Sequence, residues 1–238
     1  MAKLYPRCSG RSLFSAFFLL ILFQAGQAAA QIIYVDSAAV SNSHTKDGLS
    51  WSTAFDDLQD ALATATSGAE IRLAKGTYYP TNGTDRSISF ELISGVAIYG
   101  GYSANTAIPD ERDVHLYRTI LSGDLNEDDG DLFTNRTDNS YTVVYAQNVS
   151  ASTRLDGLTI SSGNADDNNL PYEDRNSSGG GIFNDGRTSA SVPTLFDCII
   201  EDNQAQFFGA GIFNDGSTST GNTNLLIQNC LFQNNRAE

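Results

Sequence analysis

The chain has 238 residues, with 28 acidic and 14 basic side chains and a formal net charge of −14 at pH 7. Nucleic acid and anionic lipid are poor partners for such a surface, because contacts to phosphate need clustered Lys and Arg. Cations are natural partners, although an acidic surface most often serves only solubility.

Residues 1 to 30 have the pattern of a secretory signal peptide. Basic residues come first, an apolar run from Leu13 to Phe23 follows, and small residues end the segment at Ala28-Ala29-Ala30. This apolar run is too short to span a bilayer. We expect cleavage after Ala30, with Ala28 as the other candidate site and an uncleaved anchor as the alternative. The mature chain is expected to be secreted or held at the cell surface, with no transmembrane helix.

Residues 31 to 80 are expected to form an N-terminal cap and the first strand. The run Ile32–Val35 predicts a strand, and a helix follows that is capped by Ser52 or Thr53 and ends at Gly68. The apolar face of this helix consists of Phe55, Leu58, Leu62 and Ala65. A helix in this place would cover the open end of a core of stacked strands.

Three residues of the cap could also be read as functional. Asp56 and Asp57 could form an acid pair, but at the start of a helix they more simply complement its dipole. Trp51 is the only Trp, and it fits a core plug better than a platform for sugars.

Early strands follow the cap. The segments 71–74, 96–99 and 119–121 are strand-like, and the pattern resumes at 140–145 after a polar stretch. Residues 81 to 238 are therefore expected to form successive turns of one solenoid, without a second domain.

The segment from Asp124 to Asp131 is the candidate metal site. Its alternating oxygen ligands suit Ca²⁺, and the proposed ligands are Asp124, Asn126, Asp128 and Asp131. The segment departs from the helix-flanked calcium loop, because its glycine falls at position seven and position twelve is Asn135. A plain acidic turn is the alternative.

An internal repeat organises the second half of the chain. Gly-Gly-Gly-Ile-Phe-Asn-Asp-Gly at 179–186 returns as Gly-Ala-Gly-Ile-Phe-Asn-Asp-Gly at 209–216, a period of 30 residues. A strand-like unit recurs in step with it at 157–165, 197–205 and 229–237. Such periodicity indicates a solenoid of stacked units. The polar run 166–178 is read as a surface loop inserted between two of these units.

The residue types favour a solenoid of short parallel strands over a helical one. Glycine, Asn and Ser are frequent, and they favour tight turns. Stacking would place Asn203 on Asn235, Asn184 on Asn214, and the two cysteines Cys198 and Cys230 on each other. Inward-pointing free thiols are expected, with a disulfide as the alternative. Independent surface turns are the other interpretation of the repeats.

These motifs resemble the repeat of the polymorphic outer membrane proteins and of a broader group of bacterial surface proteins. The resemblance lies in Gly179-Gly180-Gly181-Ile182, Gly209-Ala210-Gly211-Ile212 and Phe232-Gln233-Asn234-Asn235, while Ile200 stands where that motif has Phe. It implies a right-handed parallel β-helix of the pectin lyase-like type and a secreted or surface location, including the outer membrane. The broader group has no single activity. Because the chain stops directly after the third copy, we also expect further turns beyond residue 238.

An enzymatic interpretation depends on few residues. A polysaccharide lyase needs carboxylates that bind Ca²⁺ and a nearby Arg or Lys that takes the proton beside the carboxylate of the sugar. Asp185 and Asp215 would stack with Arg187 close in sequence, but the two carboxylates belong to the repeat itself. The Gly-His-Gly and Arg-x-Lys signatures of β-helix pectin hydrolases are missing, and neither His44 nor His115 has a catalytic context.

The sequence therefore predicts an all-β, right-handed parallel β-helix with an N-terminal capping helix. The predicted function is a non-enzymatic, adhesin-like scaffold that presents loops such as 166–178 to a polysaccharide or to a protein of a host or cell surface. A polysaccharide lyase or glycoside hydrolase of the same architecture is the alternative. No cofactor other than Ca²⁺ is expected.

Overall fold

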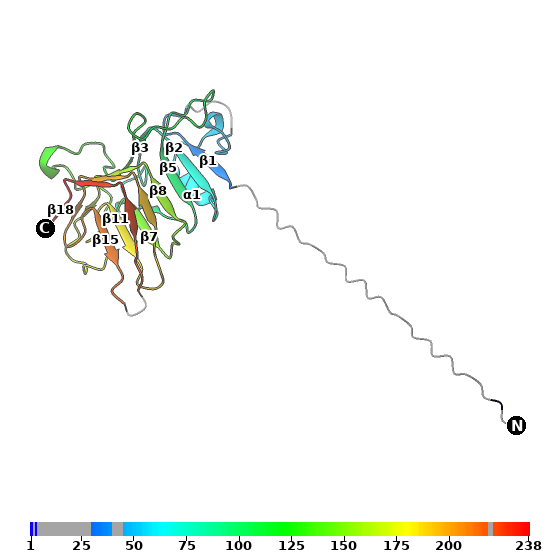
Figure 1. The fold of residues 1–238 in the computed structure, drawn as a ribbon. Helices are drawn as coiled ribbons and strands as arrows, with labels where there is room; N and C mark the ends of the chain where they lie inside the picture. Colours follow the sequence, from blue (N-terminus) through cyan, green and yellow to red (C-terminus); the bar gives the residue numbers. More distant parts are fainter. Residues whose placement is uncertain (2, 4–29, 40–44, 219–220) are drawn as a thin grey trace.

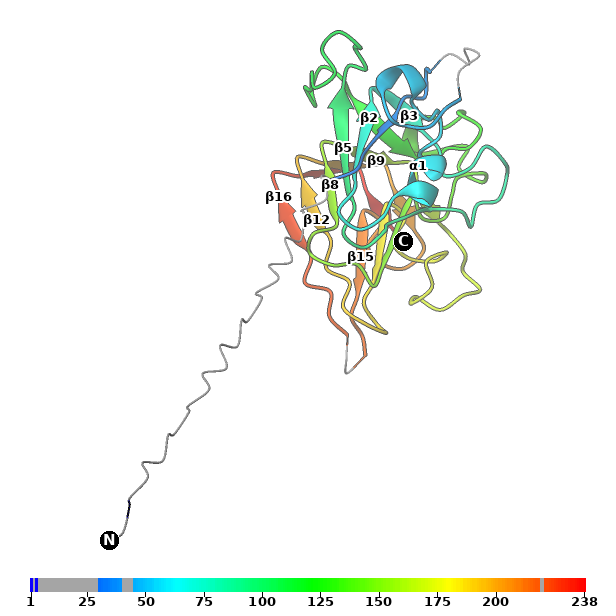
Figure 2. The same ribbon diagram turned by 90° about the vertical axis from the view of Figure 1, so that its right-hand side faces the viewer.

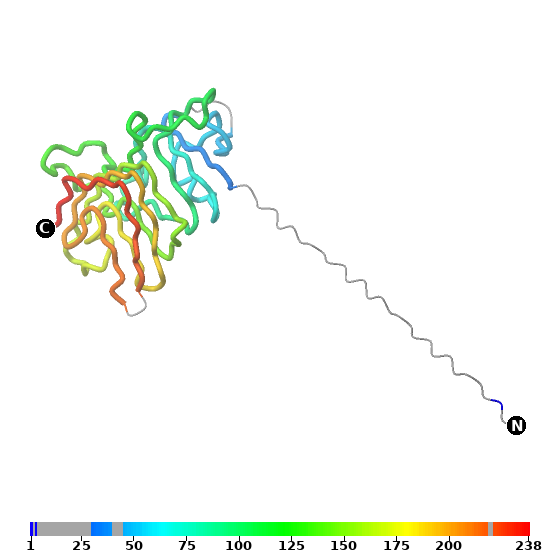
Figure 3. The backbone as a smooth tube through the Cα atoms, in the orientation of Figure 1, coloured from blue at the N-terminus to red at the C-terminus, as the bar shows by residue number. Residues whose placement is uncertain are grey.

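The computed structural model describes residues 1, 3, 30–39, 45–218 and 221–238. Residues 2 and 4–29 of the expected signal peptide, and His44, lie outside the described residues. Figure 1 shows the order of the chain as a progression of colour, from blue and cyan strands on one side of the folded body to orange and red strands on the other, and the backbone tube in Figure 3 follows the same path.

The described chain is built from short strands. In chain order they are β1 (Ile32–Val35), β2 (Glu70–Ala74), β3 (Gly76–Tyr78), β4 (Phe90–Glu91), β5 (Ala97–Tyr102), β6 (Thr119–Ser122), β7 (Val144–Gln147), β8 (Arg154–Asp156), β9 (Thr159–Ser161), β10 (Asn164–Ala165), β11 (Ile182–Asp185), β12 (Thr194–Phe196), β13 (Ile199–Glu201), β14 (Gln204–Ala205), β15 (Ile212–Asp215), β16 (Leu226–Gln228), β17 (Leu231–Gln233) and β18 (Arg236–Ala237). Every early strand expected from the sequence has a counterpart among them.

The strands form four sheets in which each strand pairing is parallel. The six-stranded sheet has the order β1-β2-β5-β8-β12-β16, and Figure 2 shows the members from β2 to β16 side by side. The five-stranded sheet has the order β3-β6-β9-β13-β17, the four-stranded sheet β4-β7-β11-β15, and the three-stranded sheet β10-β14-β18. From β8 onward the chain visits the six-, five-, three- and four-stranded sheets in turn and then begins again. The prediction of an all-β chain with parallel sheets is confirmed.

The repeat in the sequence sets the register between strands. Ile182 to Asp185 pair one to one with Ile212 to Asp215, and Ile199 and Ile200 pair with Leu231 and Phe232. Left-handed backbone recurs at equivalent corners, with φ of +68° at Gly157, +49° at Asp197 and +55° at Asn229. Glycine, Asp and Asn are the residues that tolerate this region best, so the corners repeat because the residue types do.

The expected side-chain ladders are present. The amide of Asn203 donates to Oδ1 of Asn235 at 3.0 Å, and that of Asn184 donates to Oδ1 of Asn214 at 2.5 Å. Cys198 is buried in the core and Cys230 is partly buried, and both thiols are free. Leu155 and Leu195 are fully buried at equivalent places in β8 and β12.

One α-helix, α1 (Leu58–Thr64), lies in the described chain, shorter than expected from the sequence. Its N-cap is Asp57, whose side chain accepts a hydrogen bond from the backbone N of Gln59 at 2.8 Å. The expected helix capping by Ser52 or Thr53 is wrong, because these residues lie in a separate 3-10 turn, η1 (Trp51–Thr53).

Backbone pairing explains the delayed helix start. Phe55 bridges to Val35: its N donates to the O of Tyr34 at 3.0 Å, and its O accepts from the N of Asp36 at 2.8 Å. The chain must be extended there, so the helix cannot begin before Asp57. The helix also ends before Gly68, because Ala65 already has an extended backbone.

The helix packs against the hydrophobic core of the sheets. Leu58, Ala61 and Leu62 of α1 belong to the same hydrophobic cluster as the inward residues of the sheets, and α1 contacts β1 and β4. Trp51 is also buried, with Nε1 donating to the O of Pro109 at 2.8 Å. This agrees with its interpretation as a core plug.

Candidate functional site

A connected series of aromatic rings lies on the outer face of the four-stranded sheet. Tyr145, Phe183 and Phe213 occupy one row across β7, β11 and β15. The ring centroids of Tyr145 and Phe183 are 6.1 Å apart, and those of Phe183 and Phe213 are 5.2 Å apart. Phe208 stacks on Phe213 at 6.3 Å, and Tyr172 meets Phe208 edge to face at 5.5 Å. We call these five residues the aromatic platform.

The repeated Ile-Phe-Asn-Asp strand explains this placement. Side chains alternate between the two faces of a strand, so Ile182 and Asn184 point inward while Phe183 and Asp185 point outward. The strand is preceded by a tight corner at Gly179, where φ is +74°, a conformation that glycine adopts at no steric cost.

The platform is open at its loop end. Tyr172 and Phe208 have exposed fractions of 44% and 53%, whereas Phe183 is fully buried beneath its neighbours. Tyr172 belongs to the inserted loop 166–178, which the sequence predicts as a presented loop. The aromatic pair Phe207-Phe208 just before the second glycine repeat is the feature of the sequence that corresponds to the rest of the platform, and it was not among the predicted functional residues.

A pocket of about 250 Å³ adjoins the platform. It is lined by Tyr145, Pro171, Glu173, Asp174, Arg175, Phe183 and Arg187. The guanidinium of Arg175 lies 4.7 Å from the centroid of the Tyr145 ring and pairs with Glu91 at 3.2 Å. The pocket therefore combines aromatic faces with charged groups of both signs.

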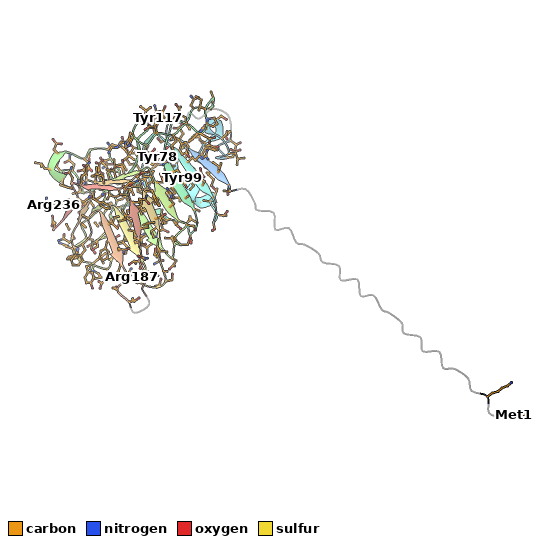
Figure 4. All side chains as sticks on the ribbon, in the orientation of Figure 1. Met1, Tyr78, Tyr99, Tyr117, Arg187 and Arg236 are labelled. Atoms are coloured by element: carbon orange, nitrogen blue, oxygen red, sulfur yellow. The ribbon has the colours of Figure 1, made fainter. Side chains whose placement is uncertain are left out.

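Asp185 is held by an arginine clamp beside the platform. Its Oδ1 accepts from Nε of Arg187 at 2.9 Å and its Oδ2 from Nη2 of Arg187 at 2.7 Å. Oδ2 also accepts from the hydroxyl of Tyr145 at 3.1 Å and from the amide of Gln147 at 3.0 Å. Figure 4 shows Arg187 near the tip where β11 and β15 end.

This clamp fixes the charge of Asp185. Burial favours its neutral form, but the hydrogen bonds and charge of Arg187 outweigh burial and lower the pKa to about 2. In turn, burial and the neighbouring Asp185 raise the pKa of Tyr145 to about 12. Neither group exchanges a proton readily near neutral pH.

Asp215 shares the same guanidinium. It pairs with Asp185 across the sheet, and its Oδ2 lies 3.3 Å from Nε of Arg187. Both carboxylates are almost completely buried. The three residues that the enzymatic interpretation singled out therefore do come together, but as one arginine that forms ion pairs with two buried carboxylates.

The structure brings together only part of the expected calcium site. Carboxylate oxygens of Asp124, Asp128 and Asp138 all lie within 4.8 Å of one another. Asp131 is outside this group and begins a 3-10 turn, η2 (Asp131–Phe133). Asn126 lies beside the group through its backbone N, which donates to Oδ2 of Asp138 at 3.0 Å. Asp138 is too far along the chain from Asp124 for a short-motif search to find it.

Calcium binding remains a prediction, and the ligands now proposed are Asp124, Asp128 and Asp138. Carboxylate oxygens are the ligands that Ca²⁺ prefers, and an ion would relieve the repulsion between three close charges. We expect millimolar Ca²⁺ to raise the melting temperature, and Asp128→Ala or Asp138→Asn to remove that gain. Asp131→Ala, the matched control, should keep it. Calorimetric melting measures each shift, and an unchanged melting temperature in the unmodified protein would remove the proposal.

A second pocket, of about 550 Å³, has an acidic lining. It contains Asp56, Asp57, Asp60, Glu127 and Tyr79 among its residues. Burial raises the pKa of Asp57, which is already engaged as the cap of α1. Asp56 is paired with Lys46. These contacts agree with the structural role that the sequence suggests for Asp56 and Asp57.

Neither a membrane-spanning helix nor a known relative was found for this chain. Within the part of the chain that the structure describes, no helix has the length and hydrophobicity that crossing a bilayer requires. No family model, curated protein or solved structure matches this chain.

Proposed function

We propose that this chain is an exported, non-catalytic binding protein built as a single right-handed parallel β-helix. The fixed order in which the chain visits the four parallel sheets supports the β-helix, because one circuit of the sheets corresponds to one repeat of the sequence. Right-handedness follows from the strong preference of parallel crossover connections for that hand. The four sheets would then be faces of one solenoid.

Export follows from the N-terminal segment. The basic, apolar and small-residue regions of residues 1–30 fit a secretory signal peptide, and the repeat resembles that of polymorphic outer membrane proteins. We place the mature chain outside the cytoplasm, either secreted or on the cell surface. The outer membrane is one such surface.

The aromatic platform carries the binding function. Soluble proteins rarely expose connected aromatic side chains, and a patch of this kind next to a polar pocket is typical of a ligand site. The flat faces of Tyr172 and Phe208 can stack on the C–H faces of sugar rings, while the charged rim can bond their hydroxyl groups. The ligand we propose is a glycan on a polysaccharide or on a surface protein.

Charge selects among glycans. Four carboxylates lie in or beside the pocket, on Glu173, Asp174, Asp185 and Asp215, against the two guanidinium groups of Arg175 and Arg187. Arg187 already forms ion pairs with two buried carboxylates, so it is not free to bind the carboxylate of an acidic sugar. Neutral glycans should therefore bind better than acidic ones.

The same contacts argue against catalysis. A general acid needs a pKa near the working pH, whereas the pKa of Asp185 is lowered to about 2 and both of its oxygens already accept hydrogen bonds. This observation favours a binding protein over a polysaccharide lyase or a glycoside hydrolase.

Binding without turnover is the expected result with the purified protein. Neutral polysaccharides such as xylan and β-glucan should retard it in affinity electrophoresis, and Phe208→Ala should weaken binding about tenfold by removing one stacking face. Pectate, alginate and glycosaminoglycans should bind less, and no polysaccharide should yield unsaturated or reducing-end products, with or without Ca²⁺.

The matched control is Leu116→Ala, which removes an exposed apolar side chain from a segment that belongs neither to the platform nor to the lining of its pocket. It should leave glycan binding unchanged. Equal loss in both variants would point to a general folding defect. Turnover that is abolished by Asp185→Ala or Arg187→Ala would overturn the proposal in favour of the lyase.

A further inference from the structure

The pocket beside the aromatic platform has the size of one sugar unit. Its volume of about 250 Å³ lies below the range of about 300 to 1,000 Å³ that is usual for drug-sized ligands. Its lining residues come from β7, from β11 with the turn after it, and from the inserted loop 166–178. Both β7 and β11 have a paired strand on each side, so the walls of the pocket are formed inside the stack of strands.

The two arginines of this pocket are already engaged. Arg175 pairs with the carboxylate of Glu91 at 3.2 Å. Arg187 pairs with Asp185 at 2.7 Å and with Asp215 at 3.3 Å. Each guanidinium therefore has at least one carboxylate of its own, and neither brings unbalanced positive charge to the pocket.

Two carboxylates of the pocket have no cation beside them. Among the residues that the structure describes, neither Glu173 nor Asp174 takes part in an ion pair. Oδ1 of Asp174 accepts from the backbone N of Asn176 at 2.8 Å, which orients the carboxylate without neutralising it. The hydrogen bond and the charge of Glu173 raise the pKa of Tyr172, so this carboxylate lies at the hydroxyl edge of a platform ring.

Negative charge is therefore in excess where a ligand would lie. The pocket and its ion-pair partners hold two guanidinium groups against five carboxylates, those of Glu91, Glu173, Asp174, Asp185 and Asp215. A concave site lined by one sign of charge attracts ligands of the opposite sign. A hydrogen bond to a carboxylate is also stronger when its donor carries a positive charge.

We propose that the glycan bound at the aromatic platform contains amino sugars, whose protonated amino group is bound by Glu173 and Asp174. This inference rests on the proposed glycan-binding function and names the class of sugar. A sugar ring stacked on Tyr172 has its substituents at the rim of that ring, next to the carboxylate of Glu173. The side chain of a lysine offers the same charge, but it has no flat C–H face to stack on the aromatic rings.

Three β-1,4-linked tetrasaccharides that differ only in the group at C2 test the proposal. Cellotetraose has a hydroxyl group there, the chitin tetrasaccharide an acetamido group, and the fully deacetylated chitosan tetrasaccharide a protonated amino group. Isothermal titration calorimetry at mildly acidic pH and low salt should show the amino form binding about tenfold more tightly than the other two. High salt should reduce this advantage by screening, and so should a pH at which the amino group has lost its proton.

Two conservative variants assign the effect to the carboxylates. Glu173→Gln and Asp174→Asn keep the shape of each side chain and remove one charge each. Each should lower the ratio between the affinities for the amino and the acetylated forms, and the double variant should bring this ratio close to one. The ratio is the readout, because a folding defect would weaken both sugars alike. The control is Asp167→Asn, which removes the same charge from the same loop outside the lining of the pocket and should keep the ratio.

The outcomes separate this inference from the proposed function. Equal or weaker binding of the amino form would overturn the inference and leave glycan binding intact. No binding of any of the three sugars would overturn the proposed function, and this inference with it. An oligolysine of the same charge that binds as tightly as the amino form would also overturn the inference, because the site would then recognise charge without a sugar ring.

Discussion

Replacing Arg187 with Ala should destabilise the protein by about 3 kcal/mol at neutral pH, because removal of one partner from a buried ion pair leaves an uncompensated charge. Here one guanidinium serves two carboxylates, Asp185 and Asp215, and both are almost completely buried. Urea unfolding, followed by circular dichroism, measures the loss of free energy.

The size of this loss should depend on pH. In the unmodified protein the pKa of Asp185 is about 2 when folded, below its ordinary value of 3.8. The stabilisation from Asp185 is therefore complete above pH 4 and is lost as the pH falls through 2. In the variant Asp185 loses the cation that lowers its pKa, so the pKa of Asp185 rises and protonation removes the unpaired negative charge. The difference between the two proteins should be largest at neutral pH and should shrink on acidification toward pH 2.

Arg118→Ala is the control for this experiment. Arg118 also pairs with a carboxylate, that of Glu201, but its side chain is half exposed. Exposed pairs contribute about 0 to 1 kcal/mol, so this variant should unfold almost as the unmodified protein does. An Arg187 variant that loses no more stability than the Arg118 variant would show that the clamp is solvated in solution.

Replacing Cys198 with Asp should cost about 3 kcal/mol or more. The side chain is buried in the main hydrophobic cluster, beside the ladder positions Leu158 and Ile200. Its sulfur lies within hydrogen-bonding distance of the backbone carbonyl oxygens of Phe196 and Leu155, and it also interacts with the thiol of Cys230. A carboxylate in this place would have no cation nearby and would face carbonyl oxygens, which also carry negative partial charge. Either the cost of burying the charge or the cost of protonating it therefore lowers the free energy of unfolding.

Cys198→Ala separates charge from packing. It leaves only a small cavity, and we expect it to cost clearly less than the Asp variant. Thiol titration of the unfolded, unreduced protein should find two free thiols in the mature chain, in line with the free Cys198 and Cys230 of the structure. A mild loss in Cys198→Asp, or the absence of free thiols, would contradict the ladder of inward thiols.

Several features of the fold could be predicted because they depend on residues close in sequence. Alternation within Ile182-Phe183-Asn184-Asp185 and its return at 212–215 predict two strands, and a fixed period predicts that they stack in register. The Asn203 and Asn235 ladder follows from the same reasoning, because equivalent residues of stacked strands must be neighbours. Glycine and Asn at the corners mark where the backbone turns.

The cap shows where this local reasoning fails. Ser52 and Thr53 are good helix caps by residue type, yet Asp57 caps the helix because Phe55 is held extended against Val35. The partner strand is 20 residues away in the sequence, and no local propensity records it. Tertiary pairing overrides a weak local preference.

The candidate sites depend even more on distant residues. The sequence predicts that Asp185 and Asp215 stack near Arg187, but only the structure shows that one guanidinium contacts both carboxylates. Tyr172 and Phe208 meet because the inserted loop folds back over the outer face of the four-stranded sheet. Asp138 joins Asp124 and Asp128 by closure of a loop rather than by a motif.

The sequence by itself determined the strand repeats, the parallel stacking and the inward ladders, since each of these is a consequence of periodicity in residue type. Only the tertiary structure decided which outward side chains meet, because that depends on how loops of different length return to the sheets. The repeated Asp of β11 and β15 illustrates the difference: its recurrence is local information, whereas the pairing of both copies with one arginine requires two strands and a turn to be placed together.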